Sequence, residues 1–148
     1  MIKIESKLIQ SNLTHKIRLG VLWPHKNTSN CFLAEDNLKD TFHVGTFLKD
    51  ELVSIGTFIY QNNIIFDEND KQYRLRAMAT KKKYQGISMG SKLIMFAKNE
   101  LIKRKVKLLW CDARKIAIPF YENLGFKSQG EFYHIPKIGP HKLMYLYL

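Results

Sequence analysis

The sequence has 148 residues, of which 45% are apolar and 25% charged, which is typical of a globular domain that buries its own core. No apolar run approaches the roughly 20 residues that span a bilayer, and the N-terminal MIKIESKLIQ lacks a signal-peptide core. We therefore expect a single domain over residues 1–148, with no membrane association. Cys31 and Cys111 are the only cysteines and lack metal-ligand spacing, so we expect a reducing, cytoplasmic location and no metal.

The net charge of +11 arises from 24 basic and 13 acidic residues. Such an excess suits nucleic acid, an anionic membrane or a polyanionic cofactor. However, the lysines are spread along the whole chain, and there is no arginine-rich helix or aromatic-basic ladder. A nucleic-acid-binding domain therefore rests on charge alone, and we expect no specific nucleic-acid partner.

The N-terminal half of the chain predicts one helical segment and several strands. Leu13, Ile17, Val21 and Leu22 fall near helical spacing, and Pro24 ends that segment. The strands that we expect here are residues 1–10, 31–34, 42–49 and 52–60, with a further short one at 64–66 inside a loop over 62–71.

In the C-terminal half, strands alternate with helices. A strand over 72–80 leads into KKKYQGISMGSK at 81–92, which opens a helix to about Lys105 with an apolar face that includes Leu93 and Leu101. The remaining elements are a strand at 108–113, a short helix at 116–124, and strands at 127–135 and 142–148. This order predicts a mixed α/β (α+β) domain.

The turn at 85–91 carries the first chemical signal. A glycine-bearing turn between a strand and a helix aims backbone N–H groups at one point, where the helix dipole adds positive charge. This geometry suits a phosphate group. A P-loop is excluded because Gly86 and Gly90 are too close together, with Ser91 where a lysine is needed.

The pattern QGISMG at 85–90 resembles the Gln/Arg-x-x-Gly-x-Gly/Ala loop of the GNAT acetyltransferase superfamily, with Ser88 where glycine is usual. The segment FYENLGF at 120–126 resembles a second motif of that family at the expected separation. The resemblance runs from about Val44 to Leu148. It implies a twisted mixed sheet of about seven strands, splayed between 72–80 and 108–113. It also implies acetyl-CoA or coenzyme A as cofactor, and acetyl transfer to a primary amine on a small molecule or a protein.

The resemblance also assigns the cofactor contacts. Backbone groups at the end of strand 72–80 pair with the pantetheine arm, the turn amides hold the pyrophosphate, and the lysines at 81–83 reach the outer phosphate. The residues so assigned are Ala77, Met78, Ala79, Thr80, Gln85, Gly86, Ile87, Ser88, Met89, Gly90, Ser91 and Asn123. The alternatives are that the glycines merely permit a turn and close helix packing, and that Asn123 caps a helix end.

For catalysis, the resemblance places Tyr121 beside the thioester, where its hydroxyl acts as general acid. It can also be only a buried aromatic residue. The general base is open among Asp112, His141 and a chain of water molecules. Asp112 can instead form an internal ion pair with Arg114.

Two further expectations concern side-chain environment. Arg74 and Arg76 alternate onto one face of their strand, where they either meet an acidic acceptor or pair with Asp67 and Glu68. At Ser88 we expect a negative φ, with the helix starting at or just before it, because glycine alone adopts positive φ readily.

The alternative to an enzyme is a non-catalytic CoA-binding or regulatory module of the same fold. Ser88 and the absence of a glutamate on strand 72–80 favour that alternative. The protein is expected to be a monomer or a homodimer.

Overall fold

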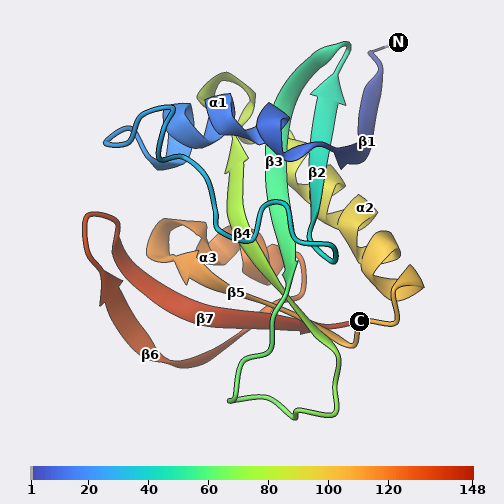
Figure 1. Cartoon of the computed structure of the whole chain (residues 1–148), viewed down its shortest axis with the longest axis vertical. Coiled ribbons are helices and arrows are strands. Elements are labelled where there is room, and N and C mark those ends of the chain that lie inside the picture. The colour runs from blue at the N-terminus through green and yellow to red at the C-terminus, as the bar shows by residue number, and fades with distance from the viewer. Residues whose placement is uncertain (1) are drawn as a thin grey trace.

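The computed structural model describes residues 2–148 and contains one seven-stranded sheet of order β1-β2-β3-β4-β5-β7-β6 (Figure 1). Neighbouring strands are antiparallel except for β4 and β5, which run parallel. The predicted mixed sheet of seven strands is thereby confirmed. The strands are β1 (Ile4–Ile9), β2 (Phe42–Leu48), β3 (Glu51–Tyr60), β4 (Gln72–Thr80), β5 (Leu108–Arg114), β6 (Lys127–Ile135) and β7 (Gly139–Tyr147).

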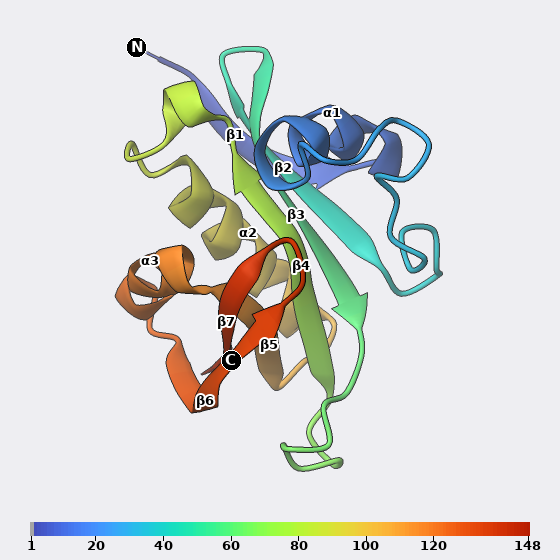
Figure 2. The same cartoon turned by 90° about the vertical axis from the view of Figure 1, so that its left-hand side faces the viewer.

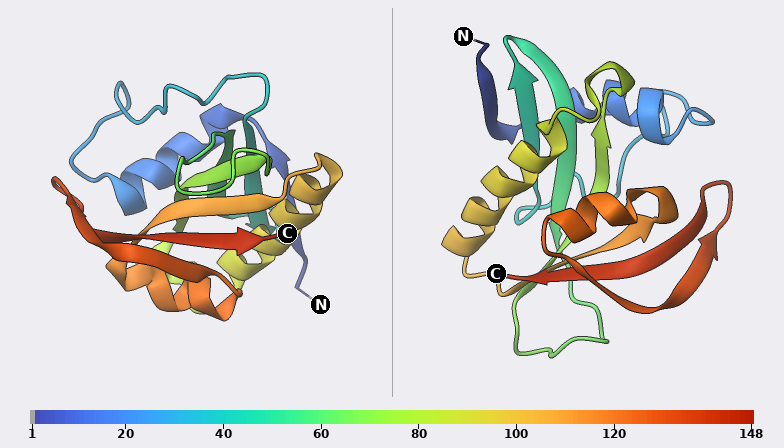
Figure 3. Two further views of the ribbon diagram at one scale, coloured as in Figure 1. Left: turned by 90° about the horizontal axis from the view of Figure 1, so that it is seen from below. Right: turned by 180° about the vertical axis from the view of Figure 1, so that it is seen from behind.

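Helices cover both faces of the sheet (Figures 2 and 3). One face carries α2 (Met89–Lys103) and α3 (Ile118–Asn123), each preceded by a short 3₁₀ turn, η3 (Lys82–Tyr84) or η4 (Lys115–Ala117). The other face carries the N-terminal helical segment, which runs through a 3₁₀ turn η1 (Ser11–Thr14), α1 (His15–Ile17) and a π turn η2 (Arg18–Leu22). The predicted N-terminal helix is therefore present, but as three short turns of different pitch.

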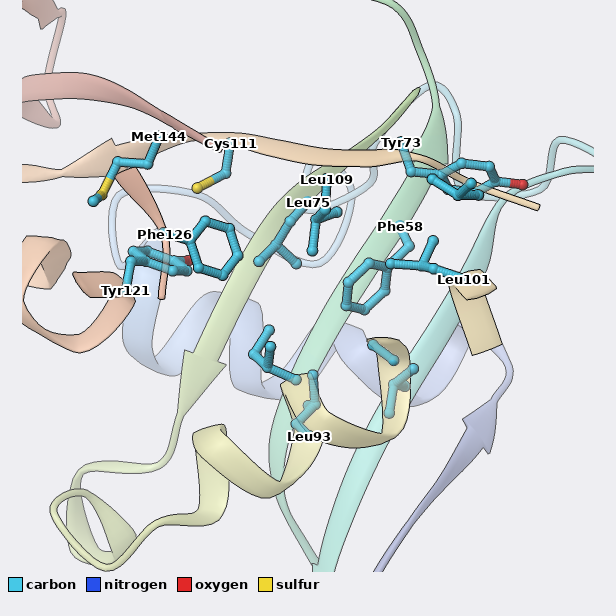
Figure 4. Close-up of a cluster of buried hydrophobic side chains, with 14 of the residues drawn as sticks. Phe58, Tyr73, Leu75, Leu93, Leu101, Leu109, Cys111, Tyr121, Phe126 and Met144 are labelled. Carbon is cyan, nitrogen blue, oxygen red and sulfur yellow. The ribbon is translucent and has the colours of Figure 1, made fainter. Parts of the chain in front are cut away.

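The main core lies between α2, α3 and the sheet (Figure 4). The apolar face predicted for α2 is confirmed, since Leu93, Ile94, Ala97 and Leu101 are all fully buried. Figure 4 shows Leu93 and Leu101 facing the strands that carry Phe58 and Leu75. Burial of such a face, rather than helix propensity, supplies most of a helix's stability in a folded protein.

Two predicted strands are wrong. Residues 31–34 form a loop and the start of a turn, where Cys31 and Leu33 pack against Trp23 and Ile59 instead of pairing with a strand. Residues 64–66 lie in a turn in which the side chain of Asn63 accepts a hydrogen bond from the Ile65 N–H. In both places the apolar run is so short that a strand and a loop with buried apolar side chains would give the same sequence pattern.

The predicted splay between the two parallel strands is confirmed. β4 and β5 pair only from Gln72–Leu75 to Leu108–Cys111, although both strands continue beyond this ladder. In the diverging part, β4 also shifts register against β3, so that Arg76 and Ala79 pair with β3 while Ala77, at φ 52°, and Met78 do not. The divergence leaves backbone N–H and C=O groups without a neighbouring strand, and a ligand can use them.

No helix within residues 2–148 is both long enough and apolar enough to cross a bilayer. Cys31 and Cys111 are both buried and unpaired.

Candidate active site

Two cavities meet where β4 and β5 diverge. The larger, of about 650 Å³, lies between the end of β4, the turn before α2, and α3. The smaller, of about 200 Å³, lies between β4, β5 and the β6–β7 hairpin. Leu22, Met78, Arg114, Ala117 and Tyr121 line both cavities, so the two cavities adjoin one another at these residues.

The turn before α2 borders the larger cavity and contains two left-handed residues. Gly86 has a φ of 80°, and Ser88, the residue before the helix, has φ 71° and ψ 15°. The first intrahelical acceptor is the Ser88 carbonyl, which takes the Lys92 N–H at 3.0 Å. The N–H groups from Met89 to Ser91 therefore precede the helical ladder and are available to an anion.

The prediction for Ser88 is wrong on both counts, because its φ is positive and the helix begins at Met89. The chain must reverse sharply between η3 and α2, and left-handed backbone at Gly86 and Ser88 accomplishes this. A non-glycine residue in that conformation costs about 1–2 kcal/mol. The serine side chain makes no capping hydrogen bond that would offset this cost.

Gly90 and Gly86 serve different purposes. A Cβ on Gly90 would lie 3.1 Å from the side chains of both Met78 and Phe120, so α2 packs closely against β4 and α3 here and these side chains would have to shift by a few tenths of an ångström to admit a larger residue. A Cβ on Gly86 would meet nothing within 4 Å, and glycine is needed there for its positive φ. The packing interpretation thus applies to Gly90, whereas Gly86 shapes the turn.

Most of the residues predicted to contact the cofactor line the larger cavity. Ala77 borders only the smaller cavity, while Ile87 and Asn123 are exposed and line neither. The predicted residues that line the larger cavity are Met78, Ala79, Thr80, Gln85, Gly86, Ser88, Met89, Gly90 and Ser91. Of the three lysines, Lys82 lines it, and Lys81 is paired with Glu51 at 3.0 Å.

Tyr121 lies at the junction of the two cavities. It is 6% exposed, packs against Phe120 and Phe126 with ring centroids 5.1 Å apart, and faces Cys111 (Figure 4). Burial, followed by the adjacent Cys111 thiol, raises its pKa well above the ordinary value. Tyr121 therefore remains a neutral hydroxyl at neutral pH. Burial likewise raises the pKa of Cys111, so that its nucleophilic thiolate form is not populated.

Asp112 lies in the smaller cavity, and its partner is Arg74 rather than the expected Arg114. Arg74 Nη2 donates to Asp112 Oδ2 at 2.6 Å, and the Tyr133 hydroxyl donates to Oδ1. Burial and then this hydrogen bond to Asp112 raise the pKa of Tyr133. Arg114 instead donates to the backbone carbonyl of Leu22 at 3.0 Å.

Arg76 also has a different partner from those expected. Its Nη1 lies 3.4 Å from Glu35 Oε1, on the loop after η2, and Asp67 and Glu68 do not pair with either arginine. Both arginines face the smaller cavity, as their alternation along β4 predicts. Only the folding of the N-terminal loop over the sheet brings Glu35 to this place.

The comparisons identify the family. Residues 22–134 match the family described as Acetyltransferase (GNAT) domain. The chain is also 38% identical over 142 residues to the uncharacterized N-acetyltransferase YitI of Bacillus subtilis (strain 168), covering 96% of this chain and 95% of YitI. This chain is a GNAT acetyltransferase.

Solved structures of low identity share the GNAT fold. Escherichia coli ElaA aligns with a TM-score of 0.74 at 19% identity, over 98% of this chain and 99% of ElaA. An aminoglycoside 6'-N-acetyltransferase complexed with coenzyme A aligns with a TM-score of 0.75 at 17% identity, over 97% and 96% of the two chains. At these identities the likeness concerns the fold alone.

Within this GNAT fold, His141 occupies the smaller cavity in a defined tautomer. The residue is 4% exposed, and its Nδ1 lies 2.8 Å from the Gly139 carbonyl oxygen. Because a carbonyl can only accept, Nδ1 carries the hydrogen, and Nε2 is the ring nitrogen left to exchange a proton with a ligand. A neutral histidine in this tautomer can accept a proton within the cavity.

Sequence reasoning missed two residues of the GNAT site. Tyr133, which binds Asp112, is opposite His141 in the β6–β7 register. Arg114 lines both cavities, but it was considered only as a partner of Asp112. The alternation of β5 would have placed Arg114 on the same face as Asp112, whereas no local signal indicates the hairpin register at Tyr133.

Proposed function

We propose that this GNAT protein transfers the acetyl group of acetyl-CoA directly to a primary amine. The observation that carries the proposal is the meeting of two cavities at Tyr121, one bordered by free helix N-terminal amides and the other by titratable side chains. Acetyl-CoA supplies an acetyl group on a thioester when bound. This arrangement suits a direct reaction between two ligands, one in each cavity.

The larger cavity fits coenzyme A in size and chemistry. Its volume lies within the roughly 300–1,000 Å³ of small-molecule sites. The N–H groups of Met89, Gly90 and Ser91 would bind the pyrophosphate, with Lys82 adding positive charge. The unpaired edge of β4 at Ala79 and Thr80 would bind the amide-bearing pantetheine arm.

Three groups of this chain would serve the acetyl transfer. The backbone N–H of Met78, in the diverging part of β4, donates to the carbonyl oxygen as negative charge develops there. The neutral ring of His141 takes the proton that the amine loses. Asp112, whose two oxygens already bind Arg74 and Tyr133, is less available as a base and instead positions these side chains.

Tyr121 would stabilise the departing sulfur. Its pKa is raised by burial, whereas an ordinary thiol has a pKa of about 8.5. Complete proton transfer from Tyr121 to a thiolate is therefore uphill. The hydroxyl acts chiefly as a hydrogen-bond donor to the sulfur, and solvent supplies the proton after the bond breaks.

The test combines ligand binding with turnover. CoA and acetyl-CoA should raise the melting temperature, while NAD and ATP at equal concentration should not. Tyr121→Phe keeps the ring and its packing, so it should retain CoA affinity but lower turnover about 10- to 1000-fold. A flat response to CoA would refute the cofactor assignment. Tight CoA binding without turnover on any amine would instead favour a non-catalytic module.

A further inference from the structure

The smaller cavity contains more positive than negative charge. Arg74, Arg76 and Arg114 line it, and Asp112 is the only carboxylate that residues 2–148 contribute to its wall. Asp112 is held by Arg74 at 2.6 Å. Arg114 has no carboxylate partner anywhere in residues 2–148. Of the three guanidinium groups, that of Arg74 pairs with the Asp112 carboxylate in the cavity wall, whereas those of Arg76 and Arg114 do not.

Arg76 is the guanidinium best suited to exchange partners. Its one acidic contact, to Glu35, is a single long interaction of 3.4 Å, and the two side chains are 33% and 31% exposed. A guanidinium presents a planar fork of donors that matches a carboxylate with two bonds. Burial, followed by the neighbouring Arg74 charge, lowers the pKa of Arg76, which is expected where a cation lacks sufficient counter-charge.

This charge pattern discriminates among amines. An acceptor that carries only positive charge is repelled, whereas an acceptor with a carboxylate beside its amine is attracted. The same field favours the neutral amine over the ammonium, and the neutral amine is the nucleophilic form.

The size and the apolar walls of the cavity narrow the acceptor further. Its volume of about 200 Å³ is below the roughly 300 Å³ at which sites for drug-sized ligands begin. Leu22, Trp23, Ile135 and Ile138 supply apolar surface. A molecule of the size of one amino acid with an apolar side chain fits these limits.

We propose that the acceptor is a small amino carboxylate with an apolar side chain, whose carboxylate binds Arg76 in place of Glu35. This rests on the proposed acetyl transfer. The amine nitrogen forms a bond to the acetyl carbon as the carbon–sulfur bond breaks. The amine proton passes to His141 Nε2, and the thiolate takes a proton from solvent, which yields an N-acetyl amino carboxylate and CoA.

The first test compares matched acceptors. Each set contains an amino acid, its carboxamide and the amine without the carboxyl group: L-leucine, L-leucinamide and isopentylamine, and L-phenylalanine, L-phenylalaninamide and phenethylamine. Release of the CoA thiol gives kcat/KM for each. The amino acids should exceed both analogues by at least about tenfold. The amine of the carboxamide is less basic than that of the amino acid, so a larger fraction of it is in the neutral, nucleophilic form at the assay pH. This difference alone would favour the carboxamide, so a preference for the amino acid cannot be attributed to amine basicity.

Variants at the ion pair test the assignment to Arg76. Arg76→Gln should reduce kcat/KM for the amino acid to that of its carboxamide and leave the carboxamide value and CoA affinity unchanged. In Arg76→Lys, kcat/KM for the amino acid should lie between the values of the parent and of Arg76→Gln, because lysine keeps the positive charge but lacks the two parallel donors of the guanidinium. Glu35→Gln removes the competing carboxylate and should lower KM for the amino acid. Arg104→Gln, just after α2 and outside both cavities, is the matched control and should change none of them.

A binding measurement tests the amino-carboxylate site at Arg76 independently of whether acetyl transfer occurs. Calorimetry at saturating CoA compares N-acetyl-L-leucine with N-acetyl-L-leucinamide. If N-acetyl-L-leucine binds more tightly than its carboxamide and Arg76→Gln removes the difference, the carboxylate site is supported. If no acceptor is acetylated in the same preparation, only the proposed acetyl transfer is refuted. Equal binding, or no binding of either, overturns the amino-carboxylate site. Equal or faster acetylation of the carboxamides and amines also overturns it, while acetyl transfer stands.

Discussion

Two arginine–aspartate pairs in this protein have similar contact distances but different surroundings. Arg18 and Asp36 share two hydrogen bonds of 2.8 Å, and their side chains are 0% and 4% exposed. Arg74 and Asp112 share one bond of 2.6 Å and are 21% and 24% exposed at the wall of the smaller cavity. The first pair is sealed in the interior, and the second can meet a ligand.

The buried pair connects segments that are distant in the sequence. Arg18 also donates to the Cys31 carbonyl and to the Thr57 hydroxyl, and Asp36 accepts the Leu33 N–H. These bonds fasten the N-terminal helical segment and the loop after it onto β3. Trp23, which lines the smaller cavity, is part of the chain held in this way. The pair therefore builds the wall of a site that it does not touch.

The comparison shows that burial decides the role of an ion pair. Breaking a buried pair leaves an unpaired charge in the interior, which is strongly destabilising. A partly exposed pair contributes little to stability and can exchange its partners for those of a ligand.

The largest difference should be in stability. Asp36→Asn should lower the free energy of unfolding by about 3–5 kcal/mol, because the Arg18 guanidinium loses its counter-charge in the interior. Asp112→Asn, the same substitution at the exposed pair, should cost about 1 kcal/mol or less. Urea denaturation of both variants and the parent measures this. Equal losses would show that the two pairs do not differ in their structural role.

Acetyl transfer should show the reverse order. Asp112→Asn should lower kcat/KM about 10- to 100-fold, or about 1.4–2.8 kcal/mol of activation free energy, because Arg74 and Tyr133 lose the group that positions them. Asp36→Asn, assayed at a temperature at which it remains folded, should retain activity within about threefold. A greater loss of activity in the Asp36 variant than in the Asp112 variant would contradict the assignment.

The titratable side chains next to the two pairs should change the stability of the protein at opposite ends of the pH scale. Burial lowers the pKa of His43, which hydrogen-bonds Thr57 and the Asp36 carbonyl, below its ordinary 6.5. The unfolded chain therefore binds more protons just below pH 6.5, and stability falls as the pH decreases from there, by about 1.4 kcal/mol per pKa unit of depression. His15, with its pKa also lowered by burial and then by Arg18, adds to the same slope.

At the exposed pair, Tyr133 has a raised pKa. Its contribution to stability is complete below pH 10 and is lost as the pH rises further, because the unfolded chain releases the proton first. Unfolding free energies measured from pH 5 to 11 should show both limbs. His43→Gln should reduce the slope of the acid limb. Tyr133→Phe should reduce the slope of the alkaline limb without abolishing it, because burial also raises the pKa values of Tyr121 and Cys111. A variant that flattens the other limb would contradict the assignment.

Salt should produce the smallest difference. A double-mutant cycle on Arg74 and Asp112 should yield a coupling energy that decreases by a few tenths of a kcal/mol between 0.1 M and 1 M salt, because exposed charges are screened. The cycle on Arg18 and Asp36 should be insensitive to salt. If the coupling energy of Arg18 and Asp36 decreased more with salt than that of Arg74 and Asp112, the assignment of Arg18–Asp36 as the more solvent-shielded pair would be contradicted.

The elements whose signals are local can be predicted from the amino-acid sequence. The apolar face of α2, the strand over 72–80 and the glycine turn before α2 each occupy a short window, so their periodicity and residue types identify them directly. Resemblance to GNAT proteins added the number of strands in the sheet and its splay. Most residues assigned to the cofactor from that resemblance line one cavity.

The partners of the charged side chains and the backbone conformation of the turn before α2 depend on tertiary contacts. Asp36 reaches Arg18 across 18 positions, and Asp112 reaches Arg74 across 38, through loops whose course no local pattern specifies. Ser88 adopts a positive φ because the segments on either side impose a sharp reversal that outweighs the preference of a single serine. Local preferences are worth about 1 kcal/mol each, whereas the burial of several side chains between distant segments is worth several kcal/mol in sum, so the fold prevails where the two conflict.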